Sequence, residues 1–366
     1  KRLTADDIKE NITNNRTINE EQENLYNLGR KRKPYMYIMR NILWGLNTWN
    51  TKDLNAWIDE FSPEIMVYVA GSFAYSYKIA LYIAKSRKLP LVVYFSDDYY
   101  ITHLKNLSPL YWLNRLHFKS VMKTVFHYLS DYICICDEME KDYAKAFNKK
   151  GHVLMTTTNF KPINVKRFDG KFIISFLGNV DFNRSKVLIE VGQVVKKLNS
   201  EGYNIEFSIY SGETDKERTK EFTLENGIHF KGKVNYDQVC EAISKSNLLL
   251  HVESFDEINR TKTRYSISTK IPDSLASGRC LFAYGPSEVA SIKYLKENDC
   301  AYVVTEPNNL ESGLRDIVEN EFLRSQYVYK AKQVADENHN FMKNTMKFKR
   351  LLQSTIIRSY DESTSN

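Results

Sequence analysis

The feature that most constrains this chain is a pattern that occurs twice, in which short apolar runs alternate with amphipathic stretches of helical period. In the first half the apolar runs lie at 64–69, 90–95, 131–136 and 153–155. The helical stretches between them lie at 73–87, 110–129 and 138–147. Strands that read as continuous apolar runs are buried on both faces, so helices must cover both sides of their sheet. The pattern therefore predicts an α/β fold with a parallel sheet.

The second half repeats the pattern after a segment without period, 156–170, which carries Pro162 and is interpreted as a linker. Strands are predicted at 172–177, 205–210, 228–230, 248–252, 280–284 and 301–304. Helices are predicted at 185–198, 236–244, 271–277, 287–297, 310–320 and 321–357. We therefore predict a first domain over 1–160, a second over 161–335, and a C-terminal helix over 336–366 that returns to the first domain.

The first sixty residues depart from this pattern, because they are polar, helix-like and rich in lysine, and only 35–39 has the pattern of a strand. The opening strand-helix unit of the first sheet is therefore predicted to be missing or altered. The basic stretch 30–33 runs into the aromatic stretch 35–49. Two interpretations stay open for these residues: an interface with an anionic membrane, or a helix packed on the first domain.

Composition sets further bounds on a chain of 366 residues, a length that suits two domains. The formal net charge of +7 favours an anionic partner such as nucleotide phosphates, a membrane surface or nucleic acid, unless it reflects only a solvated lysine-rich surface. The sequence contains no run of 18 apolar residues, so no membrane span is predicted. Five cysteines without metal or redox spacing predict a reduced, cytoplasmic protein, and the lysine, asparagine and tyrosine content suggests an AT-rich bacterial genome.

Candidate ligand-binding residues follow the predicted strands, because ligands of such sheets bind beyond the carboxyl ends of the strands. Gly178 ends the first strand of the second half, and Arg184 and Lys186 lie at the start of the next helix. Glycine permits close approach of a ligand to the backbone, and the helix terminus with its cations favours an anion such as a diphosphate. Solvated cations at a helix start are the alternative.

A second candidate precedes the helix predicted at 271–277. Ser268 and Thr269 would cap this helix and leave amide donors for phosphate oxygens, and Lys270 adds a positive charge. Asp273, one turn later, has a carboxylate that accepts both hydroxyls of a ribose. A simple capped helix with exposed charges is the alternative.

Taken together, two segments resemble the donor-binding half of glycosyltransferase family 4. They are IHFKGKVNYDQVCEAISKSNLLLHVES at 228–254 and STKIPDSLASGRCLFAYGP at 268–286. The family pattern, roughly S-x-K-x-x-E-x-L-A-x-G-x-P, is matched by Ser268, Lys270, Asp273, Leu275, Ala276 and Gly278. The segment FLGN, which ends at Asn179, resembles the family's opening strand and glycine. The resemblance covers 172–304, and 64–147 more loosely.

This resemblance implies the GT-B architecture, in which two Rossmann-like domains face each other across a cleft and a C-terminal helix crosses back. It implies that the donor diphosphate is held by Gly178, Arg184, Lys186, Ser268, Thr269 and Lys270. It further implies that the ribose and base are held by Asp273, Lys233 and Val234. The candidate catalytic residues are Asp97, Asp98 and His251, of which Asp97 and Asp98 end a strand of the first domain. A packed residue at the end of a strand is the alternative for His251.

The sequence departs from the family pattern at three places near the sugar, and one of them is the first-domain segment YFSDDYY at 94–100, which replaces the family's histidine. Tyr265 stands where the family has a glutamate, and Glu253 and Glu257 are displaced candidates for that role. Asn179 stands where the family has an arginine, so Arg184 is taken as its substitute.

The activity implied is a retaining transfer of sugar from a UDP- or GDP-sugar to a glycan or lipid-linked acceptor in bacterial surface polysaccharide synthesis. No metal and no cofactor are expected, and the sequence contains no D-x-D motif and no histidine pair with ligand spacing. A dehydrogenase is disfavoured because no G-x-G-x-x-G follows a strand. A non-catalytic module that binds a membrane or nucleic acid through its charge is the remaining alternative, although no nucleic-acid recognition motif occurs.

Overall fold

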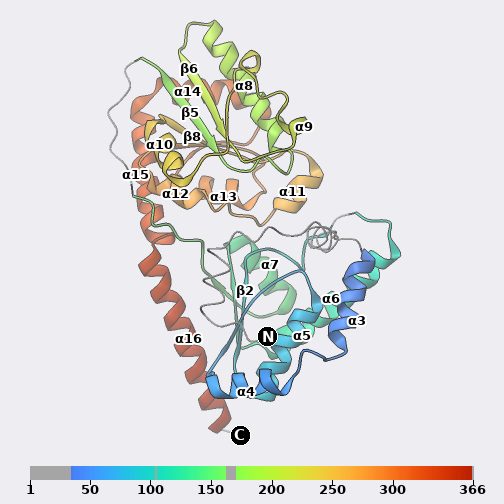
Figure 1. The fold of residues 1–366 in the computed structure, drawn as a ribbon. Coiled ribbons are helices and arrows are strands. Elements are labelled where there is room, and N and C mark those ends of the chain that lie inside the picture. Colours follow the sequence, from blue (N-terminus) through green and yellow to red (C-terminus); the bar gives the residue numbers. More distant parts are fainter. Residues whose placement is uncertain (1–33, 104, 162–169, 365–366) are drawn as a thin grey trace.

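The computed structural model describes residues 34–103, 105–161 and 170–364 (Figure 1). The first sheet has four parallel strands in the order β1-β2-β3-β4. Its strands are β1 (Met66–Val69), β2 (Leu91–Phe95), β3 (Asp131–Cys134) and β4 (His152–Val153). The helices that connect them are α5 (Ala74–Ser86), α6 (Pro109–Tyr128) and α7 (Asp137–Phe147). This sheet with its helices forms the first domain.

Local sequence signals explain where these helices begin and end. The hydroxyl of Ser108 accepts a hydrogen bond from the backbone N–H of Tyr111, and Pro109 occupies the first turn of α6, where its missing N–H costs nothing. Helix α7 begins with acidic residues that suit the positive end of the helix dipole, and it ends at Asn148 in the left-handed conformation. The residue just before β4 is Gly151, and there is no room for a side chain at this position, because a Cβ would lie 2.4 Å from the Tyr132 ring.

The second domain has a six-stranded parallel sheet in the order β10-β9-β8-β5-β6-β7. Its strands are β5 (Phe172–Leu177), β6 (Ile205–Tyr210), β7 (His229–Gly232), β8 (Leu248–Val252), β9 (Cys280–Tyr284) and β10 (Tyr302–Val304). Its main helices are α8 (Arg184–Ser200), α10 (Tyr236–Lys245), α12 (Ile271–Ala276), α13 (Ala290–Glu297) and α14 (Leu310–Glu319). The direction of the strand order reverses between β5 and β8, and such a reversal opens a crevice for a ligand.

The predicted α/β class with two parallel sheets is confirmed, but the start of the chain differs from the expectation. The stretch 35–39 lies in a helix, α3 (Pro34–Gly45), and not in a strand. Proline suits the first turn of a helix, and aromatic side chains on α3 stack on the first domain, as Trp44 does on Tyr75 with 5.0 Å between ring centroids. Among the residues described from Pro34 onward, no strand precedes β1. The basic stretch 30–33 lies outside the described residues.

Three helices and one break were not predicted. The helices are α4 (Lys52–Phe61), α9 (Lys216–Thr219) and α11 (Glu257–Thr263). The predicted helix over 321–357 is divided into α15 (Glu321–Asn338) and α16 (Phe341–Thr364). The break falls at His339, whose side chain is fully buried and whose Nδ1 lies 2.7 Å from the carbonyl oxygen of Thr156.

The two domains contact each other, and α16 runs along the first domain (Figure 1). Thr355 of α16 donates a hydrogen bond of 2.6 Å to the buried Asp131 of β3. Across the domain interface, Lys293 of α13 lies 2.7 Å from Glu138 of α7. Within the described part of the chain, no helix is both long enough and apolar enough to cross a membrane.

Candidate active site

A cavity of about 100 Å³ lies at the carboxyl ends of β5 and β8, where the strand order of the second sheet reverses. Parallel strands bring their carboxyl ends to one edge of the sheet, so residues far apart in the sequence meet there. Six of the predicted site residues line this cavity: Gly178, Arg184, His251, Ser268, Lys270 and Asp273. Two cations and one carboxylate therefore face a single small cavity.

Arg184 is held in place by a buried glutamate. Its Nη2 lies 2.8 Å and 3.0 Å from the two carboxylate oxygens of Glu253, and its Nε donates to the carbonyl oxygen of Val252. The Glu253 side chain is 1% exposed. Burial raises the pKa of Glu253, and the charge of Arg184 opposes that rise. Glu253 was a candidate for the glutamate that the family has near the sugar. In this structure it pairs with Arg184 and orients its guanidinium.

His251 forms part of the same network, in a way that does not suit a general base. Its Nε2 lies 3.1 Å from Ser291 Oγ and 3.5 Å from Glu253 Oε1. Burial, followed by the charge of Arg184, lowers the pKa of His251 to about 3. The imidazole is therefore neutral at pH 7, and its Nε2 already faces Ser291. This arrangement favours the alternative interpretation of His251 as a packed residue in the wall of the cavity.

The start of α12 differs in detail from the predicted cap. The N-cap position is Lys270 and no side chain caps it, while Ser268 Oγ accepts from the Lys270 backbone N–H at 3.4 Å. Asp273 accepts a short hydrogen bond from the hydroxyl of Thr158, in the segment that connects the domains. The proposed ribose carboxylate is thus linked to the connecting segment.

Four other predicted donor residues do not line this cavity. Thr269 is exposed beside it, and Lys186 is exposed on α8. Lys233 and Val234 follow β7, and the Lys233 side chain covers Gly212, whose Cβ position would lie 3.6 Å from Lys233 Cγ. Gly212 follows β6, and Lys233 and Val234 follow the neighbouring strand β7, at the same edge of the sheet. In the described ranges, no group of three or more metal-ligating side chains gathers at this edge or elsewhere.

The two aspartates after β2 have different surroundings. The Asp98 carboxylate accepts hydrogen bonds from the backbone N–H groups of Tyr100, Ile101 and Thr102 and from the hydroxyl of Tyr143. Three of these donors meet Oδ1 and the Thr102 N–H meets Oδ2, so the hydrogen bonds of the loop engage both oxygens of this carboxylate. The structure therefore does not support a catalytic role for Asp98, which instead fixes the loop after β2.

Asp97, by contrast, faces a cavity of about 270 Å³ between the domains. The opposite wall of this cavity is formed by Lys262, Tyr265 and Ser266 of the second domain. Partial desolvation raises the pKa of Asp97, against the hydrogen bond from the Tyr99 hydroxyl. Asp98 lines the same cavity, but its carboxylate is held by the donors of the loop, whereas the Asp97 carboxylate accepts from the Tyr99 hydroxyl.

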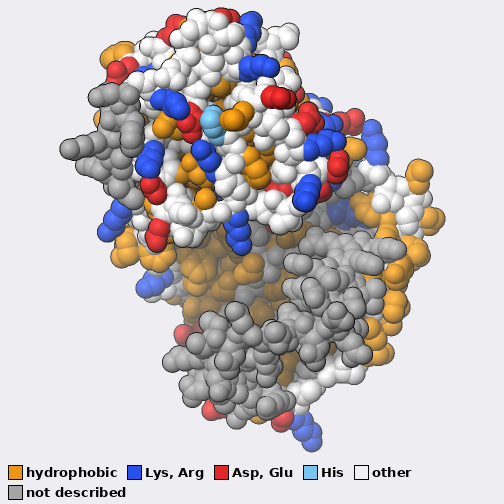
Figure 2. All heavy atoms as spheres, turned by 45° about the horizontal axis from the view of Figure 1, so that its top comes forward, with side chains coloured by type: hydrophobic (Ala, Val, Ile, Leu, Met, Phe, Trp, Pro, Cys, Tyr) orange, Lys and Arg blue, Asp and Glu red, His pale blue; other side chains and the backbone are white. Residues whose placement is uncertain are grey.

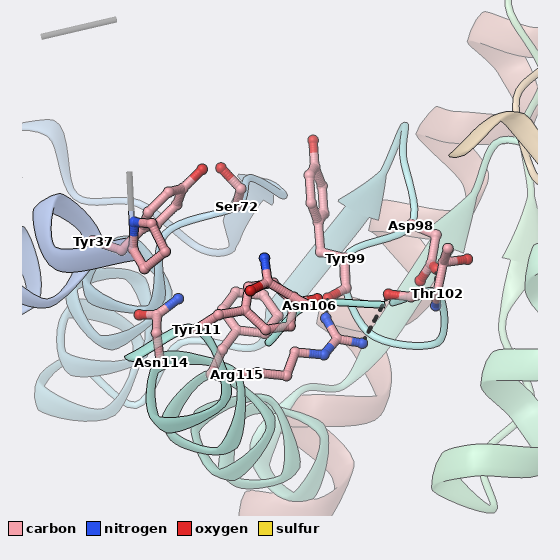
Figure 3. Close-up of a pocket in the computed structure, with 11 residues that line it drawn as sticks. Tyr37, Ser72, Asp98, Tyr99, Thr102, Asn106, Tyr111, Asn114 and Arg115 are labelled. Atoms are coloured by element: carbon pink, nitrogen blue, oxygen red, sulfur yellow. Dashed lines mark hydrogen bonds between the residues drawn. The ribbon is translucent and has the colours of Figure 1, made fainter. Parts of the chain in front are cut away.

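A third cavity, of about 350 Å³, lies in the first domain beside α3 and α6 (Figure 3). Aromatic side chains of Tyr37, Tyr99 and Tyr111 line it together with the amides of Asn106 and Asn114. It adjoins the cavity between the domains, because Asp98, Thr102 and Tyr111 line both.

Arg115, at the base of this cavity, holds the loop after β2. Its guanidinium donates to the carbonyl oxygens of Tyr99 at 2.6 Å, Thr102 at 3.0 Å and Tyr100. Sequence reasoning missed these residues. The available signal was the spacing of Tyr111, Asn114 and Arg115, which places three polar groups on one side of the first half of α6, apart from Leu110, Leu113 and Leu116.

Comparison with known proteins relates this geometry to a class. Residues 191–350 match the family described as glycosyl transferase-like. An uncharacterized glycosyltransferase of Methanocaldococcus jannaschii is 25% identical over 152 residues, which are 39% of this chain and 35% of that protein. The chain thus spans about a third of that relative's length.

Two solved structures share the arrangement of both domains. Sucrose-phosphate synthase of Thermosynechococcus elongatus has a TM-score of 0.60 at 12% identity, over 83% of this chain and 77% of that one. HepE of Anabaena, solved with UDP, has a TM-score of 0.58 at 14% identity, over 82% of this chain and 81% of that one. The fold is therefore that of the GT-B glycosyltransferases. The family match begins within α8, covers the rest of the second domain with β8 and α12, and ends in α16.

Proposed function

We propose that this chain transfers a sugar from a nucleoside-diphosphate sugar to an acceptor held by the first domain. The observation that carries this proposal is the cavity at the strand-order reversal, where Arg184, Lys270 and Asp273 meet. Arginine and lysine suit the diphosphate, and the carboxylate suits the ribose hydroxyls. The complex of HepE with UDP favours a UDP-sugar over a GDP-sugar.

The cations of the cavity fit the charge that develops in such a transfer. The bond between the sugar carbon and the diphosphate oxygen breaks, and negative charge accumulates on the departing nucleoside diphosphate. Arg184, which is held by Glu253, and Lys270 both line the cavity and would stabilise this charge in the transition state. We therefore propose that the transfer needs no metal ion and no further cofactor.

The acceptor hydroxyl supplies the new bond to the sugar carbon and must lose its proton. Asp97 is the candidate to accept this proton, since it faces the space between the domains and its pKa is raised. The resemblance to family 4 implies that the sugar keeps its anomeric configuration. Comparing the anomeric configuration of donor and product by NMR tests this directly, because an inverted product contradicts the proposal.

The cavity beside α3 and α6 is the proposed acceptor site. Tyrosine rings offer flat apolar faces to a sugar ring, and the amides of Asn106 and Asn114 offer both donors and acceptors to hydroxyl groups. The acceptor is thus proposed to be a glycan or a lipid-linked sugar, used in the synthesis of a bacterial surface polysaccharide.

Thermal-shift measurements with UDP, GDP, ADP and NAD, each with magnesium or with EDTA, test the donor site. A ligand at a hundred times its Kd stabilises a protein by about 2.7 kcal/mol. We expect UDP to stabilise the protein equally with and without magnesium, and Lys270→Ala to lose most of the effect. Lys186→Ala is the matched control, because this lysine is exposed outside the cavity.

Two results would contradict the donor site. One is the absence of a shift with any nucleotide, and the other is an equal loss in Lys186→Ala and Lys270→Ala. Salt-sensitive binding to polyanions without nucleotide dependence would instead favour the non-catalytic module.

A further inference from the structure

Helices α3 and α6 expose an unusually apolar surface, which we call the α3–α6 face. It is defined by Met39, Ile42, Leu43, Leu110, Leu113 and Leu116, whose side chains are between 44% and 64% exposed. The helices contact each other, and the Asn41 side chain donates to Asn114 Oδ1 at 3.1 Å. Figure 2 shows hydrophobic side chains gathered along the right-hand edge of the first domain, where these helices lie in Figure 1.

The apolar residues of α3 follow helical spacing but face solvent. Met39, Ile42 and Leu43 are joined by Leu46 just after the helix, at positions i, i+3, i+4 and i+7, and α3 has no buried residue. A stripe of this kind normally packs against a core. Here it is open to solvent, and large contiguous apolar surfaces usually mark sites of interaction.

The three stretches that form and support this face carry charges of one sign, although Arg87 pairs with Asp59 and Lys105 with Glu257 from other segments. Helices α3, α5 and α6 contact one another, and they lie within residues 34–52, 71–88 and 99–130. These three stretches contain ten lysines and arginines and no aspartate or glutamate. Lys78 and Lys123 are among the cations that are exposed. Apolar side chains flanked by cations are the combination that binds the surface of an anionic membrane.

This charge distinguishes between possible occupants of the face. A second copy of the chain, packed symmetrically, would bring two cationic surfaces together at the cost of repulsion. Single-stranded nucleic acid prefers aromatic side chains on which bases stack. Tyr35, Trp44 and Trp112 of the same helices are between 40% and 46% exposed, but the six residues that define the face are four leucines, an isoleucine and a methionine. An anionic lipid surface satisfies both the charge and the aliphatic character.

The same helices also form the proposed acceptor cavity. Tyr37 of α3 and Tyr111 and Asn114 of α6 line it, as Figure 3 shows, while the α3–α6 face occupies another side of the two helices. A molecule docked by this face would therefore hold its cavity close to the lipid surface.

We propose that the α3–α6 face docks on an anionic membrane, and that the acceptor is a sugar carried by a lipid of that membrane. The second part rests on the proposed transferase function, whereas the docking itself does not.

Vesicle flotation of the full chain tests the docking. One set of vesicles is phosphatidylcholine alone, and another contains about 30% phosphatidylglycerol. We expect binding to the anionic vesicles only, and a loss of roughly tenfold or more in Leu113→Ser/Leu116→Ser, because two apolar side chains no longer enter the lipid. The matched control is Leu224→Ser/Phe322→Ser, which removes two equally exposed apolar side chains from the second domain and should bind as the wild type does.

Three results would overturn the proposal: equal binding to neutral vesicles, no binding to vesicles, or unchanged binding of the Leu113→Ser/Leu116→Ser variant. Dimers in sedimentation that dissociate in this variant, without vesicle binding, would assign the face to a second copy instead. UDP stabilisation of the same variants shows that they are folded. Vesicle binding without any nucleotide effect would contradict the transferase function and leave the docking intact, so the two failures are distinguishable.

Discussion

Thr158, in the segment that connects the two sheets, donates its hydroxyl hydrogen to the carboxylate of Asp273 at the start of α12. The same residue is tied to the C-terminal crossing, because its backbone N–H donates to the carbonyl oxygen of His339 at 2.9 Å. The carboxylate proposed to hold the ribose is therefore also an anchor for the connecting segment. These two roles of Asp273 are separable by substitution.

Replacing Asp273 with alanine should weaken UDP binding at least tenfold, because two hydrogen bonds to a charged acceptor are lost, each worth about 1.5–3 kcal/mol. Replacing Thr158 with valine removes the hydrogen bond to Asp273 and the acceptor of the Phe160 N–H but leaves the Asp273 carboxylate in place, so UDP affinity should change by less than about threefold. Isothermal titration with UDP measures both variants. Equal losses in the two variants would mean that Asp273 acts through the connecting segment and not on the nucleotide.

The two cations of the donor cavity should respond differently to substitution. Arg184→Ala leaves the buried Glu253 carboxylate without its partner, and breaking a buried pair typically costs about 3–5 kcal/mol. This variant should lose stability as well as UDP binding. Lys270 is exposed, so Lys270→Ala should lose UDP binding with an unchanged denaturation midpoint. Urea unfolding monitored by circular dichroism separates these effects, and a stable Arg184→Ala protein would contradict the role of the pair.

The fold was largely predictable because buried parallel strands leave an unmistakable apolar pattern. β6 (Ile205–Tyr210) and β8 (Leu248–Val252) coincide with their predicted ranges. The failure at 35–39 has a physical reason. Aromatic residues favour strands by propensity, but here Tyr37 stacks on Phe73 across a helix interface, so tertiary packing decides. The break at His339 was equally hidden, because it depends on a partner 183 residues earlier in the chain.

The candidate site was predictable only in part, since strand ends can be read from a sequence but the partners of their side chains cannot. Gly178 was expected at the end of a strand and Asp273 on the helix that resembles the family pattern, and both line one cavity. That Asp98 caps a loop through three backbone N–H groups is a matter of local geometry that Asp97, its neighbour, does not share. The acceptor cavity was missed because its walls combine α3, α6 and the loop after β2, and the packing of these three segments on one another cannot be read from the sequence.

A third prediction concerns the attachment of α16. Asp131 accepts hydrogen bonds from Thr355 at 2.6 Å and from Arg358, and it lies 3.2 Å from His152 Nε2. Desolvation alone would raise the pKa of Asp131, but the hydrogen bonds from His152 and Thr355 and the charge of Arg358 lower it below the usual value. The ionised carboxylate therefore stabilises the fold above the unfolded-state pKa of about 3.9, and this stabilisation is lost as the pH falls through the lower folded-state pKa.

Asp131→Asn should thus be less stable than the wild type by about 1–3 kcal/mol at pH 7. The difference should shrink below about pH 4, where the wild-type carboxyl also becomes protonated. Urea titrations from pH 3 to pH 7 measure it. A difference that stays constant down to pH 3 would mean that the charge of Asp131 does not hold α16.

A fourth prediction concerns His339, at the break between α15 and α16. Its Nε2 lies 2.9 Å from the Tyr294 hydroxyl, and burial lowers its pKa, as it does for His251. Below about pH 6.5 each of these two histidines binds a proton in the unfolded chain but not in the folded protein. The free energy of unfolding should therefore fall with decreasing pH, by up to about 1.4 kcal/mol per pH unit for each histidine. His339→Gln should be less stable at pH 7.5, because it leaves Tyr294 or Thr156 without a matched partner, but its stability should depend less steeply on pH between 5 and 7. His127→Gln, at an exposed position on α6, is the control. An unchanged slope in His339→Gln would show that protonation of His339 does not couple to unfolding.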